Sequence, residues 1–249
     1  MNINDFLKAN ASFRYGSLSS VQSPGGISSA GQAGLQKAEK RIQAQVDSTD
    51  TQLSSMGKLK SSVSDTQISA LSLGSLKTGA TAAEEKTALN NFVSAFNKTL
   101  DTAASTAKSN TDPLSAQSSN RVAKDLTRAL SIDTATADAL KKVGASLDSG
   151  GKLVLNTQKF ESAQSTDAAG VRAALTRIGQ KISSTASKEL ASDGNVGMSL
   201  SSLNQRSSLL KSQQATLASF GQFSSGSSNS NSNSYFGTLP FGSAAYQNS

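Results

Sequence analysis

The sequence contains no cysteine and no histidine, and these two absences exclude several kinds of chemistry. Without cysteine the chain cannot form a disulfide, a thiolate nucleophile or a thiolate metal site. Without histidine it lacks the most common general base and metal ligand. The 17 acidic residues are spread along the chain, and none forms a pair that indicates carboxylate catalysis. We therefore expect a protein that is not an enzyme and that needs no cofactor or metal.

Large apolar side chains are also scarce. Tryptophan is absent, aromatic residues make up 5% of the chain, and the hydrophobic fraction is 36%, below the roughly 45–50% of ordinary globular proteins. Such a chain can bury narrow apolar stripes between helices, but hardly a thick central core. We expect an extended protein with thin seams between its helices.

The net charge of +7 is compatible with nucleic-acid binding. However, the cations are scattered, and Glu39 interrupts their densest run, residues 37–41. No aromatic residues alternate with them to form a stacking platform for bases. We expect these cations to lie on solvated helix faces, and we expect no nucleic-acid partner. Of the three functions considered for this chain, nucleic-acid binding is the weakest hypothesis.

The ends of the sequence bear on localisation. Residues 1–35 are polar and rich in Ser and Gly, with no apolar segment typical of a cleaved secretion signal. No stretch approaches the ~20 apolar residues of a membrane span. We expect no membrane insertion. The protein is then either cytoplasmic or exported unfolded by a route that needs no cleaved signal.

A first long helix is predicted from about Leu35, where apolar or neutral residues recur at alternating intervals of four and three, as in a coiled coil. This stripe consists of Ile42, Val46, Thr49, Leu53, Met56, Lys60 and Val63. The helix can continue through Ile68 and Leu71 and should end near residues 74–79. A stripe this thin needs a partner helix from this chain or from another copy.

A more globular middle follows. A helix is predicted over residues 82–108, with a capping box of Thr81 and Glu84, and further helices over 116–130 and 135–142. Between two short apolar runs, Gly150 and Gly151 indicate a β-hairpin near residues 145–156. A lone hairpin is marginally stable, so it must pack on a helix.

Coiled-coil spacing returns in the last third. After a short helix over residues 159–164, a long helix from about Ala168 carries apolar residues at intervals of four and three, and residues 193–197 interrupt the pattern. In a final helix, 198–220, leucines recur one heptad apart. The residues predicted to pair the helices, within one chain or between copies, are Ile42, Val46, Leu53, Met56, Val63, Val171, Leu175, Ile178, Ile182, Leu203, Leu210 and Leu217.

Stripes near both ends of the chain predict that the terminal helices pair with each other. The predicted fold is mainly α: an antiparallel helical bundle or coiled coil of N- and C-terminal helices, with one small β-hairpin and disordered termini. Residues 1–34 would be a flexible segment, residues 35–220 the bundle, and residues 221–249 a disordered Ser- and Asn-rich tail with an aromatic tip.

Phe92, Val93, Phe96 and Asn97 form the segment FVSAFN, which resembles the "FV-x-A-[YF]-N" element of the flagellar hook-associated protein 2, or filament cap, family. Similar elements follow in the family's order over about residues 85–220. They are Asp112-Pro113-Leu114, the helix with Val122, Leu126, Arg128 and Leu130, the hairpin run with Leu147-Asp148, Gly151, Leu153, Leu155-Asn156 and Lys159-Phe160, and the helix from Leu203 to Phe220. The family's large inserted head domains are missing, so the chain resembles a minimal or divergent member.

The resemblance implies a protein that is exported through the flagellar type III apparatus and is extracellular. It would form a homo-oligomer at the filament tip that promotes flagellin incorporation, through a leg-like bundle of its terminal helices. The implied partners are other copies, flagellin or hook-associated proteins, and an export chaperone.

The alternative is a secreted effector or translocator-like protein. It would bind its partner through the aromatic tip, which holds four of the chain's twelve Phe and Tyr residues: Tyr235, Phe236, Phe241 and Tyr246.

Overall fold

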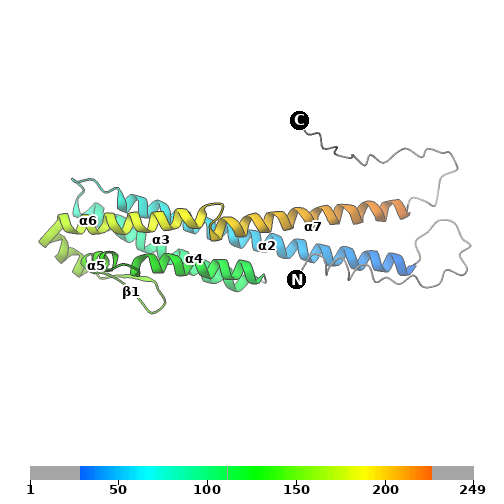
Figure 1. The fold of residues 1–249 in the computed structure, drawn as a ribbon, viewed down its shortest axis with the longest axis horizontal. Coiled ribbons are helices and arrows are strands. Elements are labelled where there is room, and N and C mark those ends of the chain that lie inside the picture. Colours follow the sequence, from blue (N-terminus) through cyan, green and yellow to red (C-terminus); the bar gives the residue numbers. More distant parts are fainter. Residues whose placement is uncertain (1–28, 111, 226–249) are drawn as a thin grey trace, which may run out of the picture. The chain divides into compact units, whose positions relative to one another are not determined.

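A computed structural model describes residues 29–110 and 112–225, with only the backbone of Ser29 and of residues 222–225 (Figure 1). The elements in chain order are α2 (Ser29–Gly74), α3 (Ala82–Ser109), α4 (Pro113–Ser131), α5 (Thr134–Lys142), β1 (Ala145–Leu147), β2 (Leu153–Leu155), α6 (Thr157–Leu190) and α7 (Asn195–Ser225). The predicted fold class, mainly α with one small hairpin, is confirmed. The aromatic tip and most of the predicted flexible N-terminal segment lie outside the described residues.

The chain divides into two compact units. The larger contains Lys40–Gln214, and the smaller contains Met1–Glu39 and Ala215–Ser249. In the smaller unit α2 already begins at Ser29, so residues 29–34 are helical and the prediction of a flexible segment there was wrong. Helix α7 likewise continues to Ser225, so the prediction of a disordered tail was wrong for residues 221–225. Leu35 lies beside Gly221, where an added Cβ would be 3.4 Å from the leucine Cδ2. The first turns of α2 and the last turns of α7 are therefore neighbours within this unit.

Helix α3 begins where the predicted capping box lies. The Glu84 backbone N–H donates to the Thr81 hydroxyl, and the Thr81 backbone N–H donates to the Glu84 carboxylate at 2.7 Å. These hydrogen bonds satisfy two N–H groups that a helix start leaves unpaired. They also lower the pKa of Glu84, with the Thr81 backbone N–H as the largest cause.

Helix α6 contains the break that the sequence predicts. At Asp167 the backbone leaves the helical region, with φ −151° and ψ 72°, between the segments expected over 159–164 and from 168. The Asp167 carboxylate accepts a hydrogen bond from the Gly170 N–H at 2.8 Å and faces Lys142 Nζ at 2.7 Å. Asp167 thus caps the second segment and ties it to α5. The lysine and the N–H lower its pKa.

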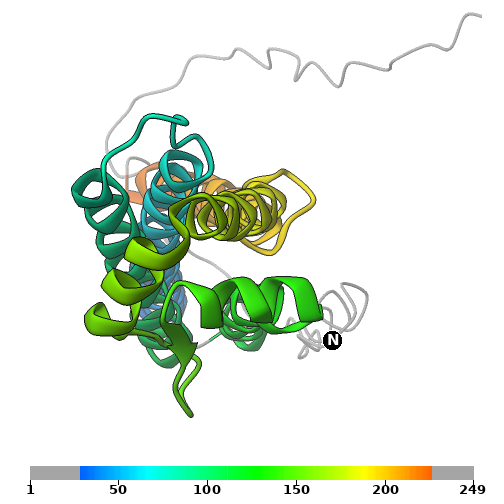
Figure 2. The same cartoon turned by 90° about the vertical axis from the view of Figure 1, so that its left-hand side faces the viewer.

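Within Lys40–Gln214, the helices pack around one core (Figure 2). Helix α3 packs on α4, both pack on α6, and α5 covers α6 beside the hairpin. The largest fully buried side chains are Phe92, Phe96, Phe160, Met56, Leu59, Leu73, Leu89, Leu126, Leu130, Leu175, Ile178 and Ile182. These side chains come from α2, α3, α4 and α6. The core is therefore formed between helices.

The seam between α2 and α3 is largely polar. The buried Thr66 and Thr99 hydroxyls lie 2.8 Å apart, and Thr99 also donates to the Ser62 carbonyl at 2.7 Å. Two turns further along α3, the Thr106 hydroxyl donates to the Ser55 carbonyl. Because each hydroxyl has a partner, burial carries little desolvation penalty. Small hydroxyl residues therefore fill a seam that large apolar residues usually occupy, which is consistent with the low hydrophobic fraction.

The predicted stripe on α2 is only partly right. Thr49, Met56 and Val63 are buried as expected, but Lys60 is exposed and Leu59 takes its place at 0% exposure. The reason is that α2 contacts helices on more than one side: Met56 lies against Ser119 of α4, and Thr66 pairs with Thr99 of α3. A helix packed on several sides buries a wider face than a two-stranded coiled coil does.

Candidate helix-pairing interface

Helices α2 and α7 lie side by side and antiparallel within the larger unit. Asp50 of α2 accepts a hydrogen bond from the Ser207 hydroxyl at 3.3 Å and faces Lys211 Nζ at 3.8 Å. Two turns earlier on α2, the Gln43 side-chain carbonyl accepts a hydrogen bond from the Gln214 amide at 2.6 Å. The partners on α7 rise in number as those on α2 fall, which defines the antiparallel direction.

All twelve residues predicted to pair the helices are buried or partly buried. Val46, Met56, Val63, Val171, Leu175, Ile178, Ile182, Leu203 and Leu210 are buried, and Ile42, Leu53 and Leu217 are partly buried. Val46 and Leu210 retain 6% exposure each, and Met56 none. The stripes are thus covered within one chain. Leu209 and Phe220, two further large apolar residues of α7, are each 59% exposed.

Helix α6 continues the antiparallel arrangement toward the C-terminal end of α2. Gln67 donates to the Ser187 hydroxyl at 2.7 Å. Further along, the backbones meet at Gly179, which is buried: a Cβ there would collide with the Ala70 carbonyl oxygen and the Gly74 backbone nitrogen. Only glycine permits this close backbone approach. Helices α6 and α7 therefore follow α2 in turn, joined at residues 191–194.

Three residues of the FVSAFN segment turn into the core or onto the hairpin. Phe92 and Phe96 are fully buried, with ring centroids 5.9 Å apart, while Val93 is partly buried beside the core. Asn97 binds the backbone of Leu153 in β2 twice: its Nδ2 donates to the carbonyl and its Oδ1 accepts from the N–H, both at 2.8 Å. The side-chain amide makes the two hydrogen bonds that a neighbouring strand would make with Leu153, and so attaches the hairpin to α3.

Asn97→Ala is expected to loosen the hairpin. It leaves both backbone groups of Leu153 without protein partners, and burying an unpaired group costs about 1–3 kcal/mol. We expect a loss of about 2 kcal/mol in the free energy of unfolding in urea, with faster hydrogen exchange at the hairpin amides of Asp148 and Asn156. Asn90→Ala, at an exposed position on the same helix, is the control. Equal exchange in the two variants would contradict the role given to Asn97.

A buried polar cluster holds the loop between α2 and α3. Glu85 is fully buried and accepts hydrogen bonds from Gln164 and from Arg172 Nε, the latter at 2.6 Å. The same guanidinium donates to the backbone carbonyls of Thr78 at 2.8 Å and Ala80 at 3.2 Å. One arginine of α6 therefore neutralises a buried carboxylate of α3 and satisfies two carbonyls of the connecting loop.

Sequence analysis missed this cluster and the Gly179 crossing. A signal for the cluster exists, because Glu85 lies four residues before Leu89, on the apolar face of α3. A carboxylate in such a position needs a partner. The partner, Arg172, is 87 residues away, and no local pattern connects the two. Gly179 likewise lies inside an apolar helix face, where spacing does not distinguish a close crossing from a tolerated glycine.

Another buried carboxylate marks the junction of α6 and α7. Glu189 accepts a hydrogen bond from Asn195 Nδ2 at 2.7 Å. Desolvation raises the pKa of Glu189, and the nearby Asp125 raises it further, while the bond from Asn195 acts in the opposite direction. The residue joins the last turn of α6 to the first turn of α7, which is a structural role.

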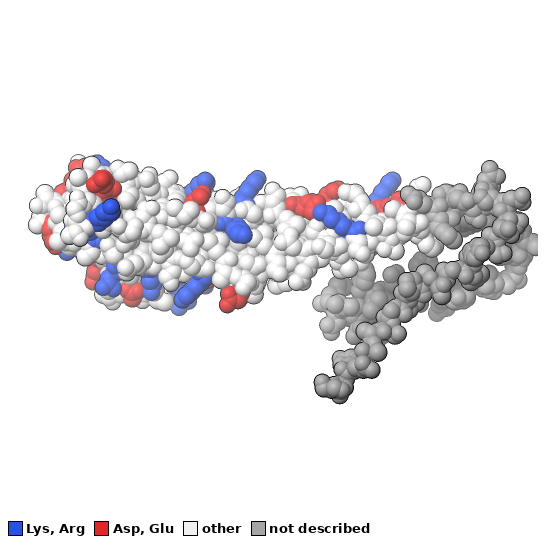
Figure 3. Space-filling view, turned by 90° about the horizontal axis from the view of Figure 1, so that it is seen from above, with Lys and Arg blue, Asp and Glu red and all other residues white. Residues whose placement is uncertain are grey.

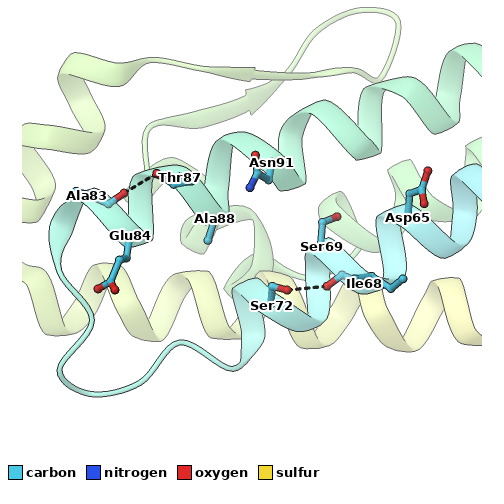
Figure 4. A pocket seen from close by; sticks show the side chains of 9 residues that line it. All are labelled: Asp65, Ile68, Ser69, Ser72, Ala83, Glu84, Thr87, Ala88 and Asn91. Atoms are coloured by element: carbon cyan, nitrogen blue, oxygen red, sulfur yellow. Dashed lines mark hydrogen bonds between the residues drawn. The ribbon is translucent and has the colours of Figure 1, made fainter.

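A mainly apolar groove lies between α2 and α3 and has a volume of about 590 Å³ (Figure 4). Ile68 lines it from α2, and Ala83 and Ala88 line it from α3. Its charged lining residues are Asp65 and Glu84, and no cation lines it. Elsewhere, on the face drawn in Figure 3, positive and negative side chains are interspersed over the described residues.

The part of the chain that the structure describes holds neither a candidate metal site nor a candidate membrane span. No group of three or more acidic side chains there could hold a metal ion. No described helix is long and apolar enough to cross a membrane.

Comparison of the chain with protein-family models, with curated proteins and with solved structures gives no significant match. The geometry and the residues themselves therefore carry the proposals that follow.

Proposed function

We propose that this chain is a structural and assembly protein of the bacterial flagellum, similar to the filament cap, and not an enzyme. It would be exported without a cleaved signal and would act outside the cell as a homo-oligomer. Flagellin or hook-associated proteins would be its partners. It would bind no nucleic acid and would not enter the membrane.

One observation carries this proposal: α7 pairs antiparallel with α2, as the contacts of Asp50 with Ser207 and Lys211 show. A helical leg of this kind is what the resemblance implies for the interaction surface. The FVSAFN segment gives secondary support, because its residues build the core and fix the hairpin. Those residues thus have a structural purpose, as expected of a building element.

The direct test is the composition of flagellar filaments. Filaments sheared from the cells that make this protein and then purified should contain it, as detected by mass spectrometry. Its absence from filaments and hooks of motile cells that express it would contradict the proposal.

Leu210→Asp should remove the protein from those filaments. Leu210 retains 6% exposure where α7 meets α2. The substitution forfeits about 1.5–3 kcal/mol of apolar burial and places a charge in the seam. Circular dichroism should show that α3–α6 stay helical while size-exclusion chromatography shows loss of assembly. Leu114→Asp, at a side chain with 71% exposure on α4, is the control. Unchanged assembly of the Leu210 variant would refute the role of the seam.

The competing hypothesis, a secreted effector or translocator-like protein, predicts a different result. Deleting residues 221–249 would then abolish binding to an envelope or host partner and leave motility normal. A flagellar assembly protein that depends on its helical leg would instead lose its place in the filament, because the deletion removes the end of α7.

A further inference from the structure

Helix α7 has an exposed outer side that carries two large apolar side chains. Leu203 and Leu210 are buried, but Met198 is 53% exposed and Leu209 is 59% exposed. These two side chains are 11 residues apart, about three turns, so they share one side of the helix over about 16 Å. The exposed Ser202 and Gln205 lie between them on the same side, so this outer stripe is apolar at its two ends and polar in the middle.

The outer stripe of Met198 and Leu209 has a positively charged residue beside it. Helix α7 contains no acidic residue, and its cations are Arg206 and Lys211. Lys211 faces Asp50 within the chain. Arg206 is exposed, forms no ion pair with a described residue, and lies one turn before Leu209. An apolar side chain with an adjacent unpaired guanidinium suits a partner surface that is apolar and acidic.

The groove between α2 and α3 has those properties (Figure 4). Ile68 on its surface is 59% exposed. The carboxylates of Asp65 and Glu84 line it without a cation, although Lys98 approaches Asp65 to 3.6 Å in an exposed pair. From Asp65 to Ser72 the groove extends about 10 Å along α2, or about two helical turns. It therefore has room for Leu209 and its flanking residues.

Leu209 of a chain cannot reach the α2–α3 groove of the same chain. Ser207 of α7 is fixed beside Asp50, and Asp50 precedes Asp65 by 15 residues of continuous helix, about 22 Å. Leu209 lies two residues beyond Ser207, on the side away from Asp65, so it is more than about 22 Å from Asp65 along α2, within the same compact unit. A second copy of the chain can bring its stripe to this groove.

We propose that copies of this protein associate head to tail, with the outer stripe of α7 in one copy docked in the α2–α3 groove of the next. Leu209 packs on Ile68, and Arg206 lies against the acidic rim. The two surfaces differ, so the contact is heterologous and generates a ring or an open chain of copies, not a closed symmetric dimer. This inference rests on the self-assembly in the proposed function and names its surfaces.

The test uses two full-length variants, each with one damaged surface. Ile68→Asp damages the groove and leaves the stripe, and Leu209→Asp damages the stripe and leaves the groove. Both side chains are exposed, so circular dichroism should match that of the unaltered protein. Ile68→Ser and Leu209→Ser replace them if either aspartate variant unfolds. Leu114→Asp is the control for an added charge at an exposed leucine.

In analytical ultracentrifugation at high protein concentration, the unaltered chain and Leu114→Asp should form species of three or more copies. Each groove or stripe variant alone should sediment as a monomer. An equimolar mixture of the two should form a 1:1 dimer and nothing larger, because one intact stripe meets one intact groove. Higher salt should weaken that dimer.

Three results would overturn the proposal: a monomeric unaltered chain, a mixture that stays monomeric, or an Ile68→Asp chain that still dimerises, which would indicate a symmetric contact between two stripes. Failure here is separable from failure of the proposed function. If the mixture forms dimers but purified filaments lack the protein, the head-to-tail contact stands and the flagellar role is contradicted. If filaments contain the protein but the mixture stays monomeric, the flagellar role stands and the head-to-tail contact is contradicted.

Discussion

Gly179→Ala is expected to lower the free energy of unfolding by about 3 kcal/mol, although it adds only one methyl group. The methyl carbon would collide with the Ala70 carbonyl oxygen and the Gly74 backbone nitrogen. Overpacking costs typically about 1–3 kcal/mol, and backbone atoms of a packed helix cannot rotate away as a side chain can. Helices α2 and α6 would have to separate. For a chain of this length the loss corresponds to a fall of about 6–12 °C in Tm.

Gly57→Ala is the matched control, because Gly57 is also a helix glycine but is exposed, with nothing within 4 Å of an added Cβ. Alanine there should raise the free energy of unfolding by about 1 kcal/mol, the usual difference in helix propensity. Urea denaturation of both variants checks the opposite signs. Two stabilised variants would show that the backbones of α2 and α6 do not approach closely at Gly179.

Arg172→Met is expected to cost about 3–5 kcal/mol, the usual effect of removing one partner from a buried ion pair. Glu85 has no exposure and would lose its cation. The carbonyls of Thr78 and Ala80 would lose their donor as well. Urea denaturation should show the loss, and hydrogen exchange should show an opened loop between α2 and α3.

The double variant Glu85→Leu with Arg172→Met should recover much of that stability, because an apolar pair can replace a buried ion pair at little cost. Arg177→Met, at an exposed position of α6, should have little effect. If the double variant were no more stable than Arg172→Met alone, the damage would come from the loop carbonyls and not from the unpaired carboxylate.

Features that depend on neighbouring residues were predictable from sequence. Thr81 and Glu84 lie three residues apart, and the capping box follows from that spacing. The turn at Gly150 and Gly151 joins strands whose pairing, Leu147 with Leu153, needs no distant information. The break at Asp167 also follows from a short local pattern. In each case the residues that determine the structure are within one or two turns of chain.

Features that depend on residues far apart in the chain were not predictable from sequence. The choice of Leu59 over Lys60 follows from helices that approach α2 on more than one side, and the heptad pattern assumes a single partner. Gly179 became informative only when Gly74 was placed against it. The burial of the residues predicted to pair the helices was predictable because their apolar character is visible in sequence. The hydrogen bonds of Asn97 to Leu153, 56 residues away, required the fold.

The pairing of α2 with α7 underlies both the fold and the proposed assembly role, and an engineered disulfide tests it most directly. The chain has no cysteine of its own, and the Ser207 hydroxyl oxygen lies 3.3 Å from Asp50 Oδ1, so the two positions face each other. Under mild oxidation, Asp50→Cys with Ser207→Cys should form an intramolecular crosslink that does not depend on protein concentration. Asp50→Cys with Leu209→Cys, whose leucine is on the exposed side of α7, should form far less. An uncrosslinked Asp50–Ser207 pair, or one crosslinked only between copies, would contradict antiparallel pairing of the terminal helices within one chain.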